Sequence, residues 1–357
     1  MKLSYFKFNL PKELIADKPT GLIPERPSDN RDVARMMVLH RDTGEIEHRQ
    51  FKDLIDYVDT HDVVVANNTK VFPSRLYGEK EKTGAKITVF LLRELNEEML
   101  LWDVVVDPAR KIRIGNKLFF GEDLSIEAEV IDNTTSRGRT IRFLYEGDHD
   151  EFISLIKSMG SAPIPDEILN MRETKPWDME RYQTIFAKHE GAVMAPTTGM
   201  HISRELLKRF EIKDVDWTEL TIHIGQEQVI EVEDLSKHRM GAEEMHINEE
   251  TCDLINNAHQ KGHKVCSIGA STLRALESAV TIPGKVSPYD GWTNKFIFPP
   301  YEFTIADMLA TNFHHPQSSQ FIMVSAFAGA EFMKEAYQVA IREKYHFGCY
   351  GDSMLIV

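Results

Sequence analysis

Residues 70–147 alternate short apolar runs with turn-forming segments, and no long amphipathic helix interrupts them. Short runs rich in β-branched and aromatic residues predict β-strands. Five of them are clear, at residues 86–93, 99–106, 116–120, 125–131 and 139–145. Several short strands with little else between them close into a barrel or sandwich, because an open sheet would expose unpaired edges. We therefore predict a small all-β barrel domain at residues 70–147.

Helical and strand-like patterns alternate on both sides of this segment. Amphipathic periodicity predicts helices at residues 150–159, 203–210, 248–261, 271–280 and 330–345. Compact apolar runs predict strands at residues 62–66, 217–224, 264–269 and 321–327. This alternation is typical of an α/β layered domain. We predict a discontinuous α/β catalytic domain, residues 1–69 and 148–357, into which the small β-barrel is inserted.

Length and composition agree with a folded protein of about two domains. The chain has 357 residues, of which 42% are hydrophobic, enough to bury two cores of about 150 residues each. No apolar run approaches the length of about 18 residues that spans a bilayer, and the N-terminus has no apolar signal core. The three cysteines are scattered without a paired motif, as expected of reduced thiols. We expect a cytoplasmic protein with no membrane contact, and a monomer.

The net charge of −14 disfavours a general polyanion binder, because phosphate contacts require clustered lysine and arginine. Two local basic strips remain, at residues 108–117 and 136–142. From the charge pattern alone, these are better interpreted as solvated strand ends and turns.

The stretch "APTTGMHIS", residues 195–203, is the first candidate for chemistry. Ser203 is placed to cap the following helix. The turn before it offers backbone amides, the hydroxyls of Thr197 and Thr198, and His201 as a proton carrier or hydrogen-bond donor. The alternative is a capped helix whose histidine is only structural, and without further information this alternative is favoured.

A second junction, "VCSIGASTLRALESA", has the form strand, small-residue turn, helix. Such a helix start can bind an anion or polar ligand, with Arg274 and Glu277 one helical turn beyond it. The alternative is that these two residues form a surface ion pair. Ser271 resembles the nucleophile of a hydrolase elbow, but Leu273 stands where that pattern requires glycine, so hydrolase chemistry is weakly supported.

The third candidate is "TNFHHPQSS", in which Thr311, Asn312 and His314 precede a proline and an apolar run. Polar residues at the mouth of a sheet commonly bind ligands. The adjacent histidines do not indicate a metal site, because neighbouring side chains point apart. The two histidines of "HQKGH" do not indicate one either, because a glycine stands where the helix that would carry both should end. We predict no metal. The C-terminal "HFGCYGDSMLIV" predicts a turn and a final strand, with Asp352 at its start.

Ordered blocks along nearly the whole chain resemble one protein family. They include "YFKFNLPKELIADKP", "VVVANNTKVFPSRLYG", "ERYQTIFAKHEGAVMAPTTGMHIS", "LTIHIG", "GASTLRALES", "GWTNKFIFPPYEF", "TNFHHPQSS" and "YGDSMLI". In this order, the blocks closely resemble the S-adenosylmethionine:tRNA ribosyltransferase-isomerase family of queuosine biosynthesis. The resemblance implies an α/β domain interrupted by a small β-barrel, as the pattern also predicts.

The resemblance further implies an enzyme that transfers and isomerises the ribosyl unit of S-adenosylmethionine. The acceptor is the aminomethyl group of a 7-deazaguanine base at the tRNA wobble position, and the products are epoxyqueuosine-tRNA, adenine and methionine. The sulfonium acidifies the neighbouring ribose carbon, so a base of moderate pKa such as histidine suits its deprotonation. Departing adenine favours a nearby hydrogen-bond donor. S-adenosylmethionine is then a co-substrate, tRNA carrying the deazaguanine precursor is the partner, and no further cofactor is expected.

Residue roles follow from placing this chemistry on the matched blocks. We expect His201 and His314 to transfer protons, with Asp352 as a weaker candidate. The substrate-binding residues expected are Thr197, Thr198, Arg274, Glu277, Thr311, Asn312 and Tyr182. Arg35, Asn68 and Arg75 match blocks that flank the inserted domain, so we expect them to contact RNA or to brace the domain junction.

Some positions depart from the family pattern. Asp166 and Glu167 add acid to a proline-rich stretch, Glu227 lies in a changed segment after "LTIHIG", and His315 and Gln317 replace an apolar residue and an arginine. RNA recognition depends on stacking and phosphate attraction, so these changes bear on the substrate more than on the fold. Two alternatives therefore stay open: a divergent paralogue that uses S-adenosylmethionine on another nucleobase or a free nucleoside, and a non-catalytic RNA-binding module.

Overall fold

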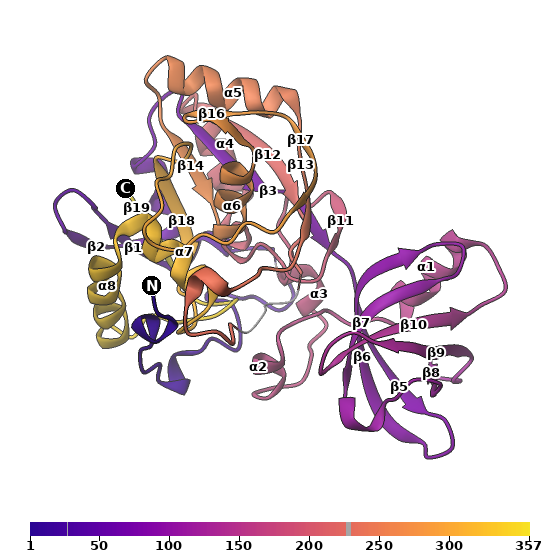
Figure 1. Ribbon diagram of the computed structural model, residues 1–357. Helices are drawn as coiled ribbons and strands as arrows, with labels where there is room; N and C mark the ends of the chain where they lie inside the picture. The colour runs from indigo at the N-terminus through magenta and orange to yellow at the C-terminus, as the bar shows by residue number, and fades with distance from the viewer. Residues whose placement is uncertain (27, 226–229) are drawn as a thin grey trace.

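The computed structural model describes residues 1–26, 28–225 and 230–357. It has a larger α/β body and a barrel at its side (Figure 1). The nine-stranded sheet of the larger body has the order β17-β13-β12-β3-β14-β18-β19-β1-β2. Its strands are β1 Arg35–Leu39, β2 Ile46–Gln50, β3 Val63–Asn67, β12 Asp216–Ile222, β13 Glu243–Ile247, β14 Val265–Ile268, β17 Tyr289–Thr293, β18 Met308–Asn312 and β19 Ser353–Ile356. Two small two-stranded sheets pair β4 Thr69–Val71 with β11 His189–Ala192, and β15 Val280–Ile282 with β16 Lys285–Val286.

Four neighbouring strands in the middle of the sheet are parallel. β12 pairs with β3, β3 with β14, and β14 with β18, all in the same direction. Every residue of β3, β14 and β18 is buried, because helices cover both faces of the sheet. β19 then returns antiparallel to β18 and parallel to β1, so the complete sheet is mixed.

Alternate strand residues face two helical layers. On one face, Val64 and Cys266 pack with Leu206 and Phe210 of α4 Arg204–Ile212 and with η4 Phe51–Asp56. On the other face, Val63 packs in a core shared with two helices, α5 Glu249–Gln260 and α6 Ala270–Ser278. Farther along the same face lie α7 Ser319–Ala328 and α8 Ala330–Arg342. The predicted α/β layered fold is confirmed, as are the predicted helices and the strands at 62–66, 217–224 and 264–269.

Short helices connect the layers. They are η1 Leu3–Phe6, η2 Lys12–Leu14, η3 Arg31–Val33, η6 Thr197–His201, η7 Leu235–Lys237, α2 Asp166–Leu169 and α3 Asp178–Arg181. Ser203 caps α4 as predicted, because its hydroxyl accepts a hydrogen bond from the amide of Leu206 at 2.9 Å.

The inserted segment forms a closed six-stranded barrel in the order β10-β7-β6-β5-β8-β9. Its strands are β5 Arg75–Lys80, β6 Ala85–Asn96, β7 Leu101–Asp107, β8 Lys117–Phe120, β9 Ile126–Asn133 and β10 Gly138–Leu144, with η5 Ala109–Lys111 between β7 and β8. All neighbours are antiparallel, and closure leaves no free edge. The predicted inserted barrel is therefore confirmed.

Helix α1 His149–Met159 packs with the barrel. Its Phe152 and Ile156 belong to the same buried cluster as the barrel's Leu76, Val104 and Phe120. We expected the inserted domain at residues 70–147, and we now propose that it extends through α1 to Met159.

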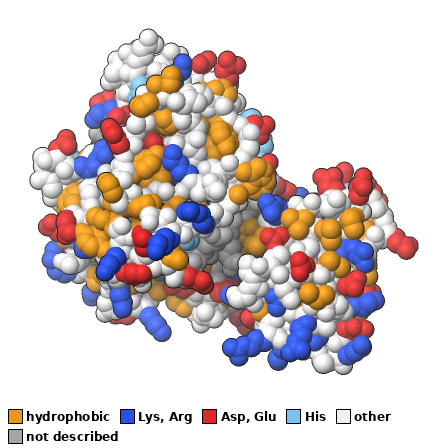
Figure 2. All heavy atoms as spheres, in the orientation of Figure 1, with side chains coloured by type: hydrophobic (Ala, Val, Ile, Leu, Met, Phe, Trp, Pro, Cys, Tyr) orange, Lys and Arg blue, Asp and Glu red, His pale blue; other side chains and the backbone are white. Residues whose placement is uncertain are grey.

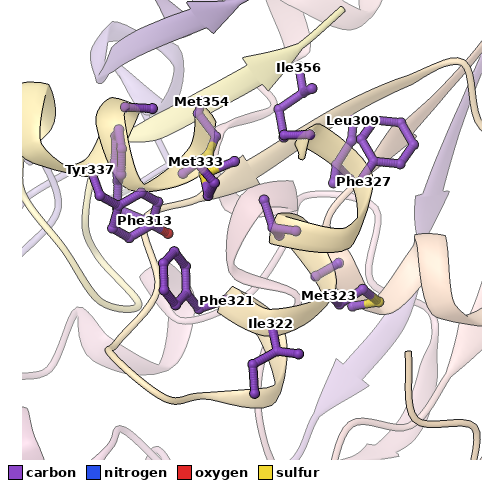
Figure 3. Packing of buried hydrophobic residues seen from close by; sticks show 14 of the residues in the cluster. Leu309, Phe313, Phe321, Ile322, Met323, Phe327, Met333, Tyr337, Met354 and Ile356 are labelled. Atoms are coloured by element: carbon purple, nitrogen blue, oxygen red, sulfur yellow. The ribbon is translucent and has the colours of Figure 1, made fainter. Parts of the chain in front are cut away.

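The predicted strand at residues 321–327 is wrong, because this segment lies within helix α7. A short run of continuous apolar residues lacks the periodicity that separates a buried helix from a buried strand. Ser318 starts the helix by accepting a hydrogen bond from the amide of Phe321 at 3.1 Å. Figure 3 shows Phe321, Ile322 and Phe327 of α7 packed among side chains of α8 and the sheet. In the part of the chain that the structure describes, no helix is long and apolar enough to cross a membrane.

Phe321 offers a direct test of this packing. It is 2% exposed and contacts the rings of Phe6, Phe8 and Tyr337. We expect Phe321→Ala to lower the free energy of unfolding by about 3–5 kcal/mol, because it opens a cavity in the core. The control Ile282→Ala removes a side chain that is 62% exposed and should change stability by less than about 0.5 kcal/mol. Equal denaturant midpoints for the two variants would contradict the observed position of α7.

Candidate active site

A cleft of about 1890 Å³ separates the α/β body from the barrel. Its walls come from β5, β6 and β7 on the barrel side, and from the segments that follow β12, β14 and β18 on the other. Figure 2 shows a hollow between the two bodies on the face in view. Because parallel strands place their carboxyl ends at one edge of a sheet, segments far apart in sequence meet here.

Six of the predicted site residues line this cleft, and the others do not. Those that line it are Thr197, Thr198, Arg274, Asn312, His314 and Arg75. The cleft lining does not include His201, Asp352, Glu277, Thr311, Tyr182, Arg35 or Asn68.

The start of α6 forms one end of the floor. Gly269 has φ +94°, a conformation that favours glycine, and brings the chain from β14 into the helix. Ala270 and Ser271 line the cleft, and the first turn of a helix leaves amide groups without acceptors inside the helix. This end of α6 is therefore suited to a negatively charged or polar ligand group.

Arg274, one turn into α6, is 6% exposed and pairs with Glu243 rather than with Glu277. Glu243 Oε1 also accepts a hydrogen bond from the amide of Gly225 at 2.8 Å. Among the described residues, Arg274 Nη1 has no hydrogen-bond acceptor. Burial lowers the pKa of Arg274 to about 10, so the guanidinium stays charged at neutral pH. The Nη1 group is therefore a buried cationic donor in a residue of the cleft wall.

Glu277 and Arg274 do not form the surface pair that was the alternative. Glu277 is 1% exposed and accepts hydrogen bonds from the amides of Thr304 and Ile305 and from the hydroxyl of Tyr301, at 3.0, 3.1 and 3.1 Å. Its carboxylate therefore fixes the segment before β18.

His314 lies two residues after β18 and lines the cleft. Its Nε2 is 2.8 Å from the hydroxyl of Thr311, and its amide donates to the Tyr337 hydroxyl at 2.9 Å. Burial, together with His315, lowers the pKa of His314 to about 3. The imidazole is therefore neutral at physiological pH. Thr311 is buried and does not line the cleft itself, so it influences the site only through its contact with this imidazole.

His201 lies behind the cleft floor, where its ring packs on Phe51 with centroids 5.0 Å apart. Burial and the Arg181 guanidinium lower the pKa of His201 to about 4, against the opposing effects of Asp352 and Asn312. Since Asn312 lines the cleft, His201 can act on a ligand only through its neighbours.

Asp352 and Tyr182 are also in the interior. Asp352 is 1% exposed and accepts hydrogen bonds from the amides of Arg35 and His346 at 3.1 and 2.8 Å. Tyr182 is 1% exposed, and its ring meets Tyr350 edge-on. Asp352 thus fixes the segment before β19, and Tyr182 packs in a core cluster with Ala195 and Met200 beside the site.

The three residues expected at the RNA or domain junction have separate positions. Arg75 Nη2 donates to Ile164 O and to Asp166 at 3.1 and 2.9 Å, so it joins the barrel to the segment before α2. Asn68 forms side-chain hydrogen bonds with Thr221 and Glu219, two residues of β12. Arg35 stacks on the Tyr345 ring at 3.7 Å and donates to Glu343 O, and it does not line the cleft.

The acidic departures from the family pattern are compensated locally. Asp166 pairs with Arg75 and Arg137, and Glu167 pairs with His315 at 3.0 Å. Glu167 and His315, which both depart from the family pattern, therefore contact each other in the wall of the cleft. The amide of Gln317 donates to Phe6 O at 3.1 Å, and Glu227 lies outside the described residues.

His223, which none of the sequence motifs singles out, lines the cleft directly after β12. Its Nδ1 is 2.7 Å from the Thr69 hydroxyl, and Gly191 lies against its ring so closely that any Cβ there would be 2.8 Å from it. Burial lowers the pKa of His223. The available signal was a histidine at the carboxyl end of the predicted strand 217–224.

One group in the described residues has the spacing of metal ligands. Glu94, Glu97 and His149 lie together at one end of the barrel. His149 Nε2 is 3.0 Å from both carboxylate oxygens of Glu94, which raises the pKa of the imidazole and favours its protonated form. His259 and His263 do not form a pair: His259 bonds Asp307, and the His263 ring lies against His61. All three cysteines are free thiols.

Comparisons with known proteins cover the whole chain. A family model described as "Queuosine biosynthesis protein" matches residues 3–356. The chain is 58% identical to the S-adenosylmethionine:tRNA ribosyltransferase-isomerase of Parabacteroides distasonis and 57% identical to that of Flavobacterium psychrophilum, each over 100% of both sequences. The crystal structure of S-adenosylmethionine tRNA ribosyltransferase from Thermotoga maritima matches with a TM-score of 0.55 and 30% identity, over 99% of this chain and 100% of that one.

The buried His201 predicts a pH dependence of stability. Its pKa of about 4 in the folded state lies below the usual 6.5, so its stabilising contribution is complete above pH 6.5 and is lost as the pH falls. Between pH 7 and pH 5 this loss should reach about 2 kcal/mol. We expect His201→Gln to show a correspondingly shallower fall in the free energy of unfolding, measured with urea at each pH. Parallel pH profiles for wild type and variant would contradict the assignment.

Proposed function

The chain belongs to the S-adenosylmethionine:tRNA ribosyltransferase-isomerase family of queuosine biosynthesis, and from that premise we propose how its cleft carries out the reaction. The enzyme transfers and isomerises the ribosyl unit of S-adenosylmethionine onto the aminomethyl-deazaguanine base of tRNA. Epoxyqueuosine-tRNA, adenine and methionine are the products. This conclusion rests on sequence identity above 50% to relatives of that name, over essentially their whole length. The same identity disfavours the divergent paralogue and the non-catalytic RNA-binding module.

The methionine carboxylate of S-adenosylmethionine binds at the start of α6. The first-turn amides offer donors there, and the buried Arg274 offers a charged N–H that has no acceptor among the described residues. Glu243 holds the guanidinium from its other side. Thr197 and Thr198, whose segment lies against Gly269, are then placed to hydrogen-bond the nucleoside.

His223 is the base that takes a proton from the ribose carbon next to the sulfonium. The Thr69 hydroxyl lies 3.5 Å from His189 O, so it can donate there and accept the His223 Nδ1 hydrogen. In that tautomer Nε2 has a free lone pair. The electron pair released by deprotonation stays on carbon as an ylide that the adjacent positive sulfur stabilises.

His314 serves departing adenine. With a pKa of about 3 it is a poor base, but as a neutral imidazole it can donate a hydrogen bond to a ring nitrogen of the leaving group. Asn312 holds the nucleoside beside it. His201, Asp352, Thr311, Glu277 and Tyr182, which we expected to act on substrate, instead keep these groups in position.

S-adenosylmethionine is the co-substrate, and we propose that no other cofactor takes part. Deprotonation, loss of adenine and attack by a neutral amine transfer protons and electron pairs within the two substrates, so no external oxidant or reductant is required. Because the partner is tRNA, we place the reaction in the cytoplasm, and we propose that a single chain suffices, since both walls of the cleft come from one chain.

The function is tested by following adenine. We expect adenine release from S-adenosylmethionine only when tRNA bearing the aminomethyl base is present, with the mass of the ribosylated nucleoside found after digestion of the RNA. Release without RNA would support the free-nucleoside alternative instead. RNA binding without any adenine would identify a binding module, and ester hydrolysis abolished by Ser271→Ala would identify a hydrolase.

His223 predicts the effect of a single substitution. His223→Gln should lower kcat by about 10²–10⁴-fold, because proton removal loses its base. Since the pKa of His223 is lowered, the acid limb of the wild-type kcat/KM profile should lie below pH 6.5. His61→Gln, an exposed histidine just before β3 and outside the cleft lining, is the matched control and should keep wild-type kcat. If both variants turn over equally, the assignment to His223 is wrong.

A further inference from the structure

Trp292 is a tryptophan that lines the cleft and is 46% exposed. It stands on β17, the edge strand of the large sheet, and the Tyr289 hydroxyl donates to its carbonyl at 2.8 Å. An exposed aromatic ring beside a nucleic-acid site offers a face on which a base can stack.

The barrel contributes the other half of this surface. The guanidinium of Arg93 lies over the Trp292 ring, 5.1 Å from its centroid. The β6–β7 register shifts between Leu91 and Arg93, and a bulge of this kind redirects the side chains beside it. A cation–π contact therefore joins the two bodies across the opening of the cleft.

The charges around this contact differ from those elsewhere in the cleft. Other basic residues of the lining pair with carboxylates: Arg75 and Arg137 with Asp166, Lys157 with Glu190, and Arg274 with Glu243. Within the described residues, Arg93 and Lys295 form no such ion pair, and Lys295 donates to Glu277 O at 2.9 Å. Carboxylates lie nearby, because Asp103 stands opposite Arg93 on β7 and Glu244 stands opposite Trp292 on β13. The Arg93 guanidinium nevertheless contacts the tryptophan ring, and within the described residues it is not in ion-pair contact with a carboxylate.

We propose that an unpaired nucleobase of the RNA loop inserts between Trp292 and Arg93 when the tRNA binds. This inference rests on the proposed function, because it names where that substrate is gripped. A base that undergoes chemistry must leave its stack, and its neighbour then loses a stacking partner. Aromatic rings and arginine planes are the groups on which proteins stack splayed RNA bases.

Stacking at this position also explains why the contact spans two bodies. An RNA loop that enters the cleft separates Arg93 from Trp292, and the inserted base replaces the cation–π contact with one stack on each side. The acidic net charge of the chain is no obstacle, because stacking does not depend on phosphate attraction.

The test uses an unmodified RNA hairpin with the sequence of the anticodon stem-loop, so that binding is measured without turnover. Binding should quench the fluorescence of the wild type, and Trp292→Phe should bind within a few-fold but lose that quenching. Trp292→Ala should weaken binding about tenfold or more. The slope of log Kd against log salt should stay the same, because no phosphate contact is removed.

Two further variants complete the test. Arg93→Ala should weaken hairpin binding, whereas Ile282→Ala, exposed and outside the cleft, should not. Hairpin affinity of Trp292→Ala within twofold of wild type, or unchanged quenching in Trp292→Phe, would overturn the proposal. Melting temperatures equal to wild type confirm that the variants fold. Hairpin binding with this signature but without adenine release from modified tRNA would refute the proposed function and leave the stacking site standing.

Discussion

The common direction of four strands determines where the chemistry takes place. Because β12, β3, β14 and β18 are parallel, the segments after them emerge at one edge, where His223, Gly269 and His314 meet. The barrel departs from this same edge, since the chain leaves β3 and passes through β4 to reach it. The position of the cleft therefore follows from the direction of these strands and from the point at which the barrel is inserted. The loops that line it are held in place by the strands that they follow.

Burial sets the chemical character of this site. The pKa values of His201 and His314 fall to about 4 and about 3, and that of His223 is also lowered, so these three imidazoles are neutral at physiological pH. Neutral imidazoles suit a cationic sulfonium substrate, because they neither repel it nor require deprotonation before they act. Arg274 is a buried cation in the cleft wall, and its pairing with Glu243 leaves Nη1 without an acceptor among the described residues.

Much of the architecture could be predicted from the sequence, whereas much of the site could not. Alternating patterns identify the barrel and most helices, but the run at 321–327 is apolar all round, so only its burial among α8 and the sheet decides that it is a helix. Polar strands at one side of the sheet, such as β13 and the edge strand β17, carry too few apolar residues to be recognised. Side-chain direction is the other missing information: His201 and His314 lie in similar polar motifs, yet only His314 reaches the cleft. Trp292 and Arg93, far apart in sequence, meet only because the barrel folds back toward the sheet.

The central claim is that S-adenosylmethionine occupies the cleft between sheet and barrel, and photolabelling tests it most directly. The enzyme would be irradiated with an azidoadenine derivative of S-adenosylmethionine, and the labelled peptides identified by mass spectrometry. The structure predicts labels in the segments around Thr197, Ser271 and His314, suppressed by an excess of S-adenosylmethionine. Specific labelling confined to the separate hollow around residues 13–24 and Trp177 would contradict it.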